Sequence, residues 1–326
     1  MRNDTELAAI VFHDTLNHPL TAWEVFRFGL RSEGTANSGQ PIQIRKYADA
    51  LDRLEQLKEQ GIIEEKNGFY FLAGRIALYA SRMQRTNIAD QKWRNVRGLL
   101  SAMRMAPFIR AIALSGSMGR GAAGHESDID IFVITEKNRI WTGRFFLTLF
   151  TLFSWRLRPG WYTRLFFPFV RHGAGRSVAN KICLHHYAAD GAQLAHRNAY
   201  TASLHASLMP LWGREAFTRF LNANGWIYGY LPHAVFSEKN RRMVAPSHVL
   251  RKLQRAGEFF LRGFFGNFFE NAIGLLQKLL IAHNPLTKLP GNVVIEGGEL
   301  AFHPTTRDKD ILDRFAIKML ELHSRA

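Results

Sequence analysis

Two aspartates separated by one apolar residue are the residues in this sequence best placed to do chemistry. Asp128 and Asp130 flank Ile129 in the segment "SDIDIFVIT", whose alternating apolar residues predict a strand. Alternate side chains of a strand point the same way, so the two carboxylates share one face, about 7 Å apart. They repel each other unless a cation lies between them, and oxygen ligands favour Mg²⁺ or Mn²⁺ over zinc. We therefore expect a divalent metal at Asp128 and Asp130, while Ile129 faces the core.

A loop of small residues, "GSMGRGAAG", precedes this pair. Gly116 and Ser117 would let backbone amides and a hydroxyl approach phosphate oxygens at the start of a short helix, and Arg120 could neutralise charge on the same phosphates. The alternatives are that Ser117 only caps the helix and that Arg120 is a solvated loop residue. With a metal nearby, the first interpretation predicts metal-assisted phosphoryl or nucleotidyl transfer from a triphosphate.

The order Gly116-Ser117, a loop, and then Asp128-Ile129-Asp130 between two expected strands resembles the DNA polymerase beta-like nucleotidyltransferase superfamily. The resemblance covers about residues 108–190. It implies a small mixed sheet flanked by helices, with Mg²⁺ (or Mn²⁺) held by Asp128 and Asp130 as the catalytic carboxylates. The implied reaction moves a nucleoside monophosphate from a nucleoside triphosphate to a hydroxyl, phosphate or amine acceptor. The acceptor itself, on a small molecule, a protein or an RNA, is left open.

Members of that superfamily often carry a third carboxylate on the strand after the connecting helix, and here this sequence departs from the pattern. The expected strand "KICLHHYAAD" has Cys183, His185 and His186 in its middle and Asp190 at its far end. Asp190 substitutes, a histidine acts as the base, or there is no third acid and catalysis is weak or absent. Since neighbouring strand residues alternate, we expect one histidine to face the core and the other the site or solvent.

The N-terminal part predicts a helical module that ends in a hairpin. Helices are expected over 5–16, 20–30 and the stretch before Gly61, and Asn67-Gly68 is a strong hairpin turn signal. This order resembles a winged helix-turn-helix in pattern only. Its acidic and basic residues nearly balance, so we expect poor binding to duplex DNA by this module alone and rank a packing or protein-contact role ahead of DNA reading.

The whole chain is predicted to be an α+β protein. Its expected parts are a winged-helix-like domain (1–80), a linker helix (81–105), a nucleotidyltransferase-type core (106–195) and a mainly helical C-terminal region (196–326). Within the core we expect strands at 108–116, 128–135 and 181–189 and an apolar helix at 138–157.

The charge of the chain favours a polyanionic partner. A net charge of +16 and a pI near 10.3 fit a nucleotide, a nucleic acid or an anionic membrane surface. Residues 137–189 combine arginines with aromatic residues, which could bind single-stranded nucleic acid or touch a membrane. The alternative is that 140–153 is a buried helix covering the sheet. A second aromatic run, at 257–282, is expected to be core or an oligomer face.

The remaining features bound the location and the class of protein. The single cysteine, Cys183, excludes an internal disulfide framework and a cysteine-built zinc site, and it fits a reducing cytoplasm. The longest apolar run, 145–155, is shorter than the roughly 20 residues that span a bilayer. The leading prediction is a cytoplasmic, metal-dependent nucleotidyltransferase of undetermined oligomeric state. The second is a weakly active or inactive regulatory or nucleic-acid-binding protein with the same fold, and the third is a peripheral membrane protein.

Overall fold

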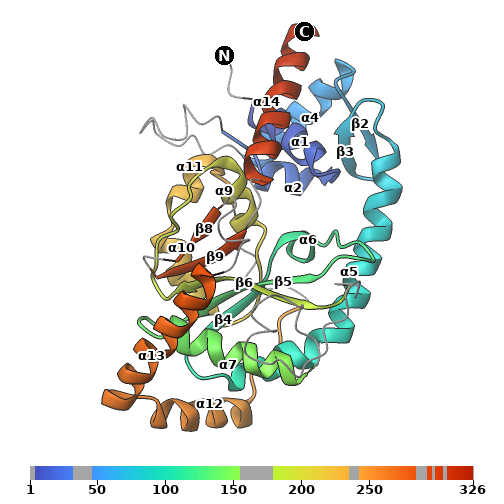
Figure 1. Cartoon of the computed structure of the whole chain (residues 1–326). Coiled ribbons are helices and arrows are strands. Elements are labelled where there is room, and N and C mark those ends of the chain that lie inside the picture. Colours follow the sequence, from blue (N-terminus) through green and yellow to red (C-terminus); the bar gives the residue numbers. More distant parts are fainter. Residues whose placement is uncertain are drawn as a thin grey trace.

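The computed structural model describes residues 4–31, 46–154, 179–234, 242–283, 292–295, 298–303 and 307–325. The fold is mixed α+β, as the sequence predicts, with one three-stranded and one six-stranded sheet among these residues. Figure 1 shows a small N-terminal unit at one end, the larger sheet in the middle and a pair of helices at the other end.

The N-terminal unit packs helices around a short hairpin. Its elements are α1 (Thr5–Thr15), β1 (Leu20–Thr21), α2 (Ala22–Arg27), α4 (Tyr47–Glu59), β2 (Ile63–Lys66) and β3 (Phe69–Leu72). The predicted turn joins β2 to β3, with Asn67 and Gly68 both at positive φ, which suits the right-handed twist of a tight hairpin. Strand β1 pairs with the other edge of β3. Thr21 and Glu24 form a capping box that begins α2.

A long helix, α5 (Ala77–Ala102), runs from this unit to the larger sheet (Figure 1). The sheet has the order β7-β4-β5-β6-β9-β8. Its strands are β4 (Ile109–Leu114), β5 (Ile129–Thr135), β6 (Ile182–Ala189), β7 (Met209–Trp212), β8 (Asn292–Val294) and β9 (Glu299–His303). Strands β5 and β6 are parallel and are connected through α7 (Ile140–Phe153), because parallel neighbours need a crossover. The other strand pairs are antiparallel.

The two faces of β5 have different roles. Ile129, Ile131 and Val133 are completely buried in one core cluster, as predicted. Phe132 and Ile134 belong to the cluster on the opposite face, so Asp130 shares its face with them. Both faces of β5 are thus buried along most of the strand, and Asp130 is its one partly exposed position.

The C-terminal part contributes strands that the sequence pattern does not reveal. The pattern of residues 196–326 predicts a mainly helical region and indicates no particular strand, but β7 adds to one edge of the sheet and β9 and β8 to the other. These strands are short, and Pro210 in β7 suits only an edge strand, so neither gives a clear period of two. The helices there are α9 (Ala199–Ala206), α10 (Arg214–Ala223), α11 (Trp226–Tyr230), α12 (His248–Phe260), α13 (Gly263–Ala282) and α14 (Arg307–Arg325).

The last helix returns to the first. Helix α14 packs along α1, where the rings of Phe12 and Phe315 lie 5.7 Å apart and Lys318 bonds the buried Asp14 (Figure 1). Among the described residues, no helix has both the length and the apolar character needed to cross a membrane.

Candidate active site

The Gly-Ser turn lies directly against the second aspartate. Strand β4 ends at Leu114, and the Ser115 N–H donates to the Asp130 carbonyl at 2.9 Å, which holds the turn beside β5. Gly116 then begins the short helix α6 (Gly116–Gly119) at a φ of 56°. A Cβ at this position would lie 2.6 Å from Asp130 Oδ2. Glycine is therefore required both by the backbone conformation and by the closeness of the carboxylate.

One cavity collects all five residues singled out by the sequence. Gly116, Ser117, Arg120, Asp128 and Asp130 line a cavity of about 760 Å³. Both carboxylates are partly exposed to it, with Asp128 just before β5 and Asp130 in the strand. The structure thus brings the glycine-serine turn and both aspartates to one cavity, and their roles in metal and phosphate binding stay predictions.

The opposite side of the cavity comes from both ends of the chain. It is lined by the end of α1 and the residues after it, by α9, and by α14, with Thr15, Leu16, Asn17, Tyr200, Asp308 and Arg314 among the lining residues. The sequence alone did not suggest these residues, since nothing in their local pattern separates them from other helix positions.

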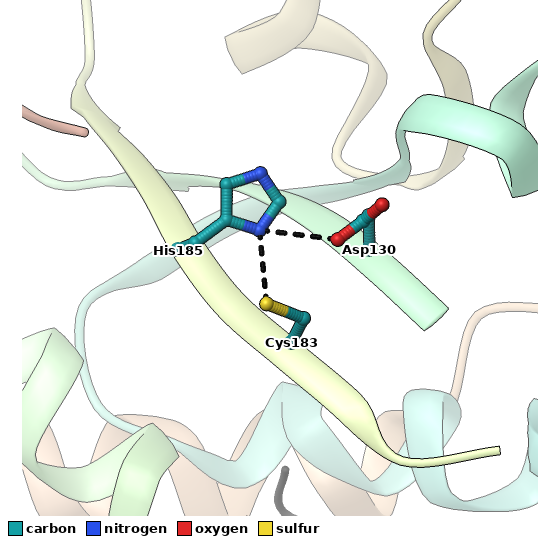
Figure 2. A group of neighbouring side chains, drawn as sticks. All are labelled: Asp130, Cys183 and His185. Carbon is teal, nitrogen blue, oxygen red and sulfur yellow. Dashed lines mark hydrogen bonds and ion pairs between the residues drawn. The ribbon is translucent and has the colours of Figure 1, made fainter. Parts of the chain in front are cut away.

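A thiol and an imidazole lie beside Asp130. Cys183 on β6 is the register partner of Asp130 on β5, so the two side chains lie next to each other. His185 Nδ1 lies 3.2 Å from Cys183 Sγ and 3.3 Å from Asp130 Oδ1. Figure 2 shows the three side chains converging from two adjacent strands. The three ligand atoms lie within 4.8 Å of one another.

Asp190 does not substitute for the missing acid. It follows β6 at the far end of the strand, where its carboxylate accepts hydrogen bonds from Arg219 on α10 at 2.6 and 2.9 Å. It is absent from the residues that line the cavity. The alternative in which Asp190 serves as the third acid is therefore wrong, because the length of β6 carries this residue away from the aspartate pair.

Both histidines of β6 face the cavity, contrary to the expected alternation. The pairing of β5 with β6 shifts register between Cys183 and His186, and this bulge turns His185 and His186 toward the same side. His186 Nε2 lies 2.9 Å from Glu299 Oε1, and both side chains are buried. A bulge depends on how two strands pair, so the sequence of one strand does not reveal it.

Glu299 is a carboxylate of the cavity that the sequence did not point to. It also accepts a hydrogen bond from the Ala195 N–H at 2.8 Å. Burial alone would raise the pKa of Glu299, but the hydrogen bond and charge of His186 and the Ala195 N–H lower that pKa below its ordinary value. The one signal for it is a charged residue at the start of the apolar strand β9. His205 lies next to His186, and burial lowers the pKa of His205 to about 3, so its ring is neutral near pH 7.

Lys92, which the sequence pattern did not indicate, holds the loop before Asp128. Lys92 on α5 donates to the carbonyls of His125 at 2.9 Å and Ser127 at 2.6 Å. Burial lowers the pKa of Lys92, while the negative charge of Asp128 opposes this change. Lys92 thus fixes the approach of the chain to the aspartate pair.

A comparison with known protein families matches the part of the chain that contains the turn and the aspartate pair. Residues 96–166 match the family model of the nucleotidyltransferase domain. The matched segment contains every residue that the sequence assigned to the site, and it supports the nucleotidyltransferase superfamily for this part of the chain. It ends before β6, so Cys183 and His185 lie outside it. No curated protein and no solved structure matches the chain.

Proposed function

We propose that the protein is a metal-dependent nucleotidyltransferase that moves a nucleoside monophosphate from a nucleoside triphosphate to an acceptor group. The observation that supports it most directly is the approach of Gly116 to Asp130, because it sets a phosphate-sized turn against a carboxylate in one cavity. Asp128 and Asp130 would hold Mg²⁺ or Mn²⁺, since carboxylate oxygens are ligands that these ions prefer. When bound, the metal would neutralise charge on the triphosphate and orient it for displacement.

The remaining steps belong to the residues of the chain. Ser117 and the backbone of the Gly116 turn bind phosphate oxygens, and Arg120 offsets the negative charge of the same group. Lys92 keeps the loop in place, so that Asp128 need not reorganise when the nucleotide binds.

The size of the cavity favours a small acceptor group. A volume of about 760 Å³ lies in the range of small-molecule sites. Residues from both ends of the chain, in α1 and α14, help to line it and so limit its size. This suits a small molecule or a single protruding group of a larger acceptor better than a duplex.

The test is label transfer from each α-labelled nucleoside triphosphate in the presence of Mg²⁺. Asp128→Asn and Asp130→Asn are expected to abolish transfer. Asp190→Asn is the matched control, because it makes the same chemical change at an aspartate outside the cavity. Equal transfer by the wild type and by the variants at Asp128 and Asp130 would overturn the proposal.

A second candidate is a binding protein with the same fold and no turnover. It is favoured by β6, the strand on which the resemblance to the superfamily implies a third carboxylate, because Cys183 and His185 lie there and no acid does. Binding to RNA or DNA that weakens steeply with salt and is unchanged by Asp128→Ala, without label transfer, would support this second candidate.

A further inference from the structure

The donor atoms beside Asp130 differ from those that Mg²⁺ prefers. Cys183 and His185 add a sulfur and a nitrogen to one carboxylate oxygen, and all three atoms lie within 4.8 Å of one another. Mg²⁺ binds almost entirely to oxygen, whereas thiolate and imidazole favour ions such as Zn²⁺ and Co²⁺. The mixed donor set therefore belongs to a different class of metal from the Asp128–Asp130 pair.

The backbone holds this donor set in place. Asp130 and Cys183 are opposite each other on paired strands, and His185, two residues after Cys183, lies on the same side of β6. Cys183 and Asp130 also line the cavity, so an ion bound there could take a further ligand from water or phosphate. Three protein ligands with one open position are typical of a zinc ion that takes part in chemistry.

We propose that Asp130, Cys183 and His185 bind a borderline divalent transition-metal ion such as Zn²⁺. The site goes beyond the proposed function and shares with it only Asp130. Binding forms a metal–sulfur bond and releases the proton of the Cys183 thiol to solvent, while His185 binds through a neutral ring nitrogen. No electron is transferred, because Zn²⁺ has no redox chemistry.

The sole cysteine makes a direct test possible. Titration of the full-length, metal-free protein with Co²⁺ is expected to produce a thiolate-to-cobalt charge-transfer band with a stoichiometry of one ion per chain. Since the sequence contains a single cysteine, such a band reports Cys183 alone. Zn²⁺ is expected to remove the band at equal concentration, and a large excess of Mg²⁺ is expected to leave it unchanged.

Variants separate this site from the nucleotidyl-transfer site. Cys183→Ser and Cys183→Ala should abolish the band, and His185→Ala should weaken Co²⁺ binding about tenfold or more; Asp190→Asn is the control. Circular dichroism and thermal melting show whether each variant is folded. Asp128→Asn should keep the band and lose label transfer. Co²⁺ binding without the band, no Co²⁺ binding, or displacement by equimolar Mg²⁺ would overturn the metal proposal, whether or not label transfer occurs.

A separate observation concerns α12 and α13, which form a helical hairpin at the end of the molecule away from α14 (Figure 1). The sequence predicts that the aromatic run here is core or an oligomer face; the exposure of many of its apolar side chains contradicts a place in the core and leaves the oligomer face untested. Phe264 and Phe265 are 81% and 78% exposed. The other exposed apolar residues of the hairpin are Val249, Leu253, Phe259, Phe260, Phe268, Leu275, Leu276 and Leu279.

The acidic and basic residues of this hairpin differ in their exposure to solvent. Its two acids are buried: Glu258 accepts hydrogen bonds from the Phe108 N–H and Arg110, and Glu270 accepts from the backbone at the start of α7. The exposed charged residues are all basic, namely Arg251, Lys252, Arg255, Arg262 and Lys278. Exposed aromatic rings among cations, with no exposed acid, are typical of helices that lie in the interface of an anionic membrane.

We infer that the α12–α13 hairpin binds the surface of an anionic lipid bilayer. A second copy of the chain would fit the exposed face of the hairpin less well than a bilayer, because a twofold contact would place these cations against each other. A bilayer accepts the exposed phenylalanines in its interface while anionic headgroups bind the surrounding arginines and lysines.

Co-sedimentation with vesicles of phosphatidylcholine, with or without phosphatidylglycerol, tests this inference. Binding is expected only with phosphatidylglycerol, and it should weaken with salt and about fivefold for each cation removed in Arg251→Gln and Lys252→Gln. Phe264→Ser with Phe265→Ser should weaken binding at least about tenfold. Ile317→Ser with Leu320→Ser, at exposed positions of α14, is the control.

Three results would overturn the inference. The first is no sedimentation of the wild type with anionic vesicles, and the second is equal sedimentation with neutral ones. The third is a wild-type dimer, seen by light scattering, that the double phenylalanine variant dissociates, since a second copy would then cover the hairpin. Melting temperatures show that the variants compared are folded.

Discussion

Replacing Gly116 by alanine tests whether the turn and Asp130 work as one unit. The new methyl group would lie 2.6 Å from Asp130 Oδ2, so the carboxylate has to move by roughly 0.8 Å to reach an ordinary contact. A displacement of about 1 Å costs a reaction on the order of 100-fold in rate. The φ of 56° adds a conformational cost of roughly 1–2 kcal/mol for a residue with a side chain.

Two nearby glycines separate these effects. Gly121 has a φ of 65° but open space around it, so Gly121→Ala should lose roughly 1–2 kcal/mol of stability and keep label transfer. Gly124 has open space and no positive φ, so Gly124→Ala should leave stability unchanged or raise it by about 0.4–1 kcal/mol. Gly116→Ala should lose both stability and about 100-fold in transfer rate.

The assays are label transfer at saturating nucleotide and urea denaturation of each variant. If Gly116→Ala transferred label as fast as Gly121→Ala, the contact between the turn and Asp130 would not matter for chemistry. If Gly121→Ala lost as much activity as Gly116→Ala, backbone strain in the loop, and not the position of Asp130, would be the cause.

Three further outcomes follow from the surroundings of the site. Lys92→Met removes the donor to the carbonyls of His125 and Ser127, so urea denaturation should show a loss of about 1–3 kcal/mol. Burial lowers the pKa of His205 from its ordinary value of 6.5 to about 3, so the unfolded chain binds the extra proton and stability falls as pH drops from 6.5 toward 3. Denaturation across this range should show a smaller fall for His205→Leu. The hydrogen bond from His186 helps to hold the folded pKa of Glu299 below its ordinary value of 4.5, so the stability that Glu299 contributes is present above pH 4.5 and is lost as pH falls through the folded pKa. Glu299→Gln should lose less stability than the wild type over that acid range.

The central part of the site could be predicted because it is local in the sequence. Gly116, Ser117, Asp128 and Asp130 lie on one strand-turn-strand unit, and the period of β5 alone decides which side chains share a face with Asp130. The predicted helix after β5 and the third strand also follow from length and apolar content. For these elements, local propensity and tertiary packing favour the same structure.

The rest of the cavity depends on contacts between distant segments. Glu299 reaches the site because β9 pairs with β6, and both histidines of β6 face it because that strand bulges against β5. The exclusion of Asp190 likewise depends on how far β6 extends. A period of two describes one strand, but register, bulges and strand order arise from pairing between strands.

The contacts of the N-terminal unit suggest that it shapes the cavity. Helix α1 ends at Thr15 on the cavity wall, and α14, which packs on α1 through Phe12 and Phe315, supplies Asp308 and Arg314 to the same wall. The exposed acids Asp49, Asp52, Glu55 and Glu59 lie along α4, where phosphate binding would need cations. Because the first and last helices hold each other in place, a change in either one would alter the space opposite the aspartate pair. The contact between the two ends of the chain therefore gives the N-terminal unit a part in shaping this cavity.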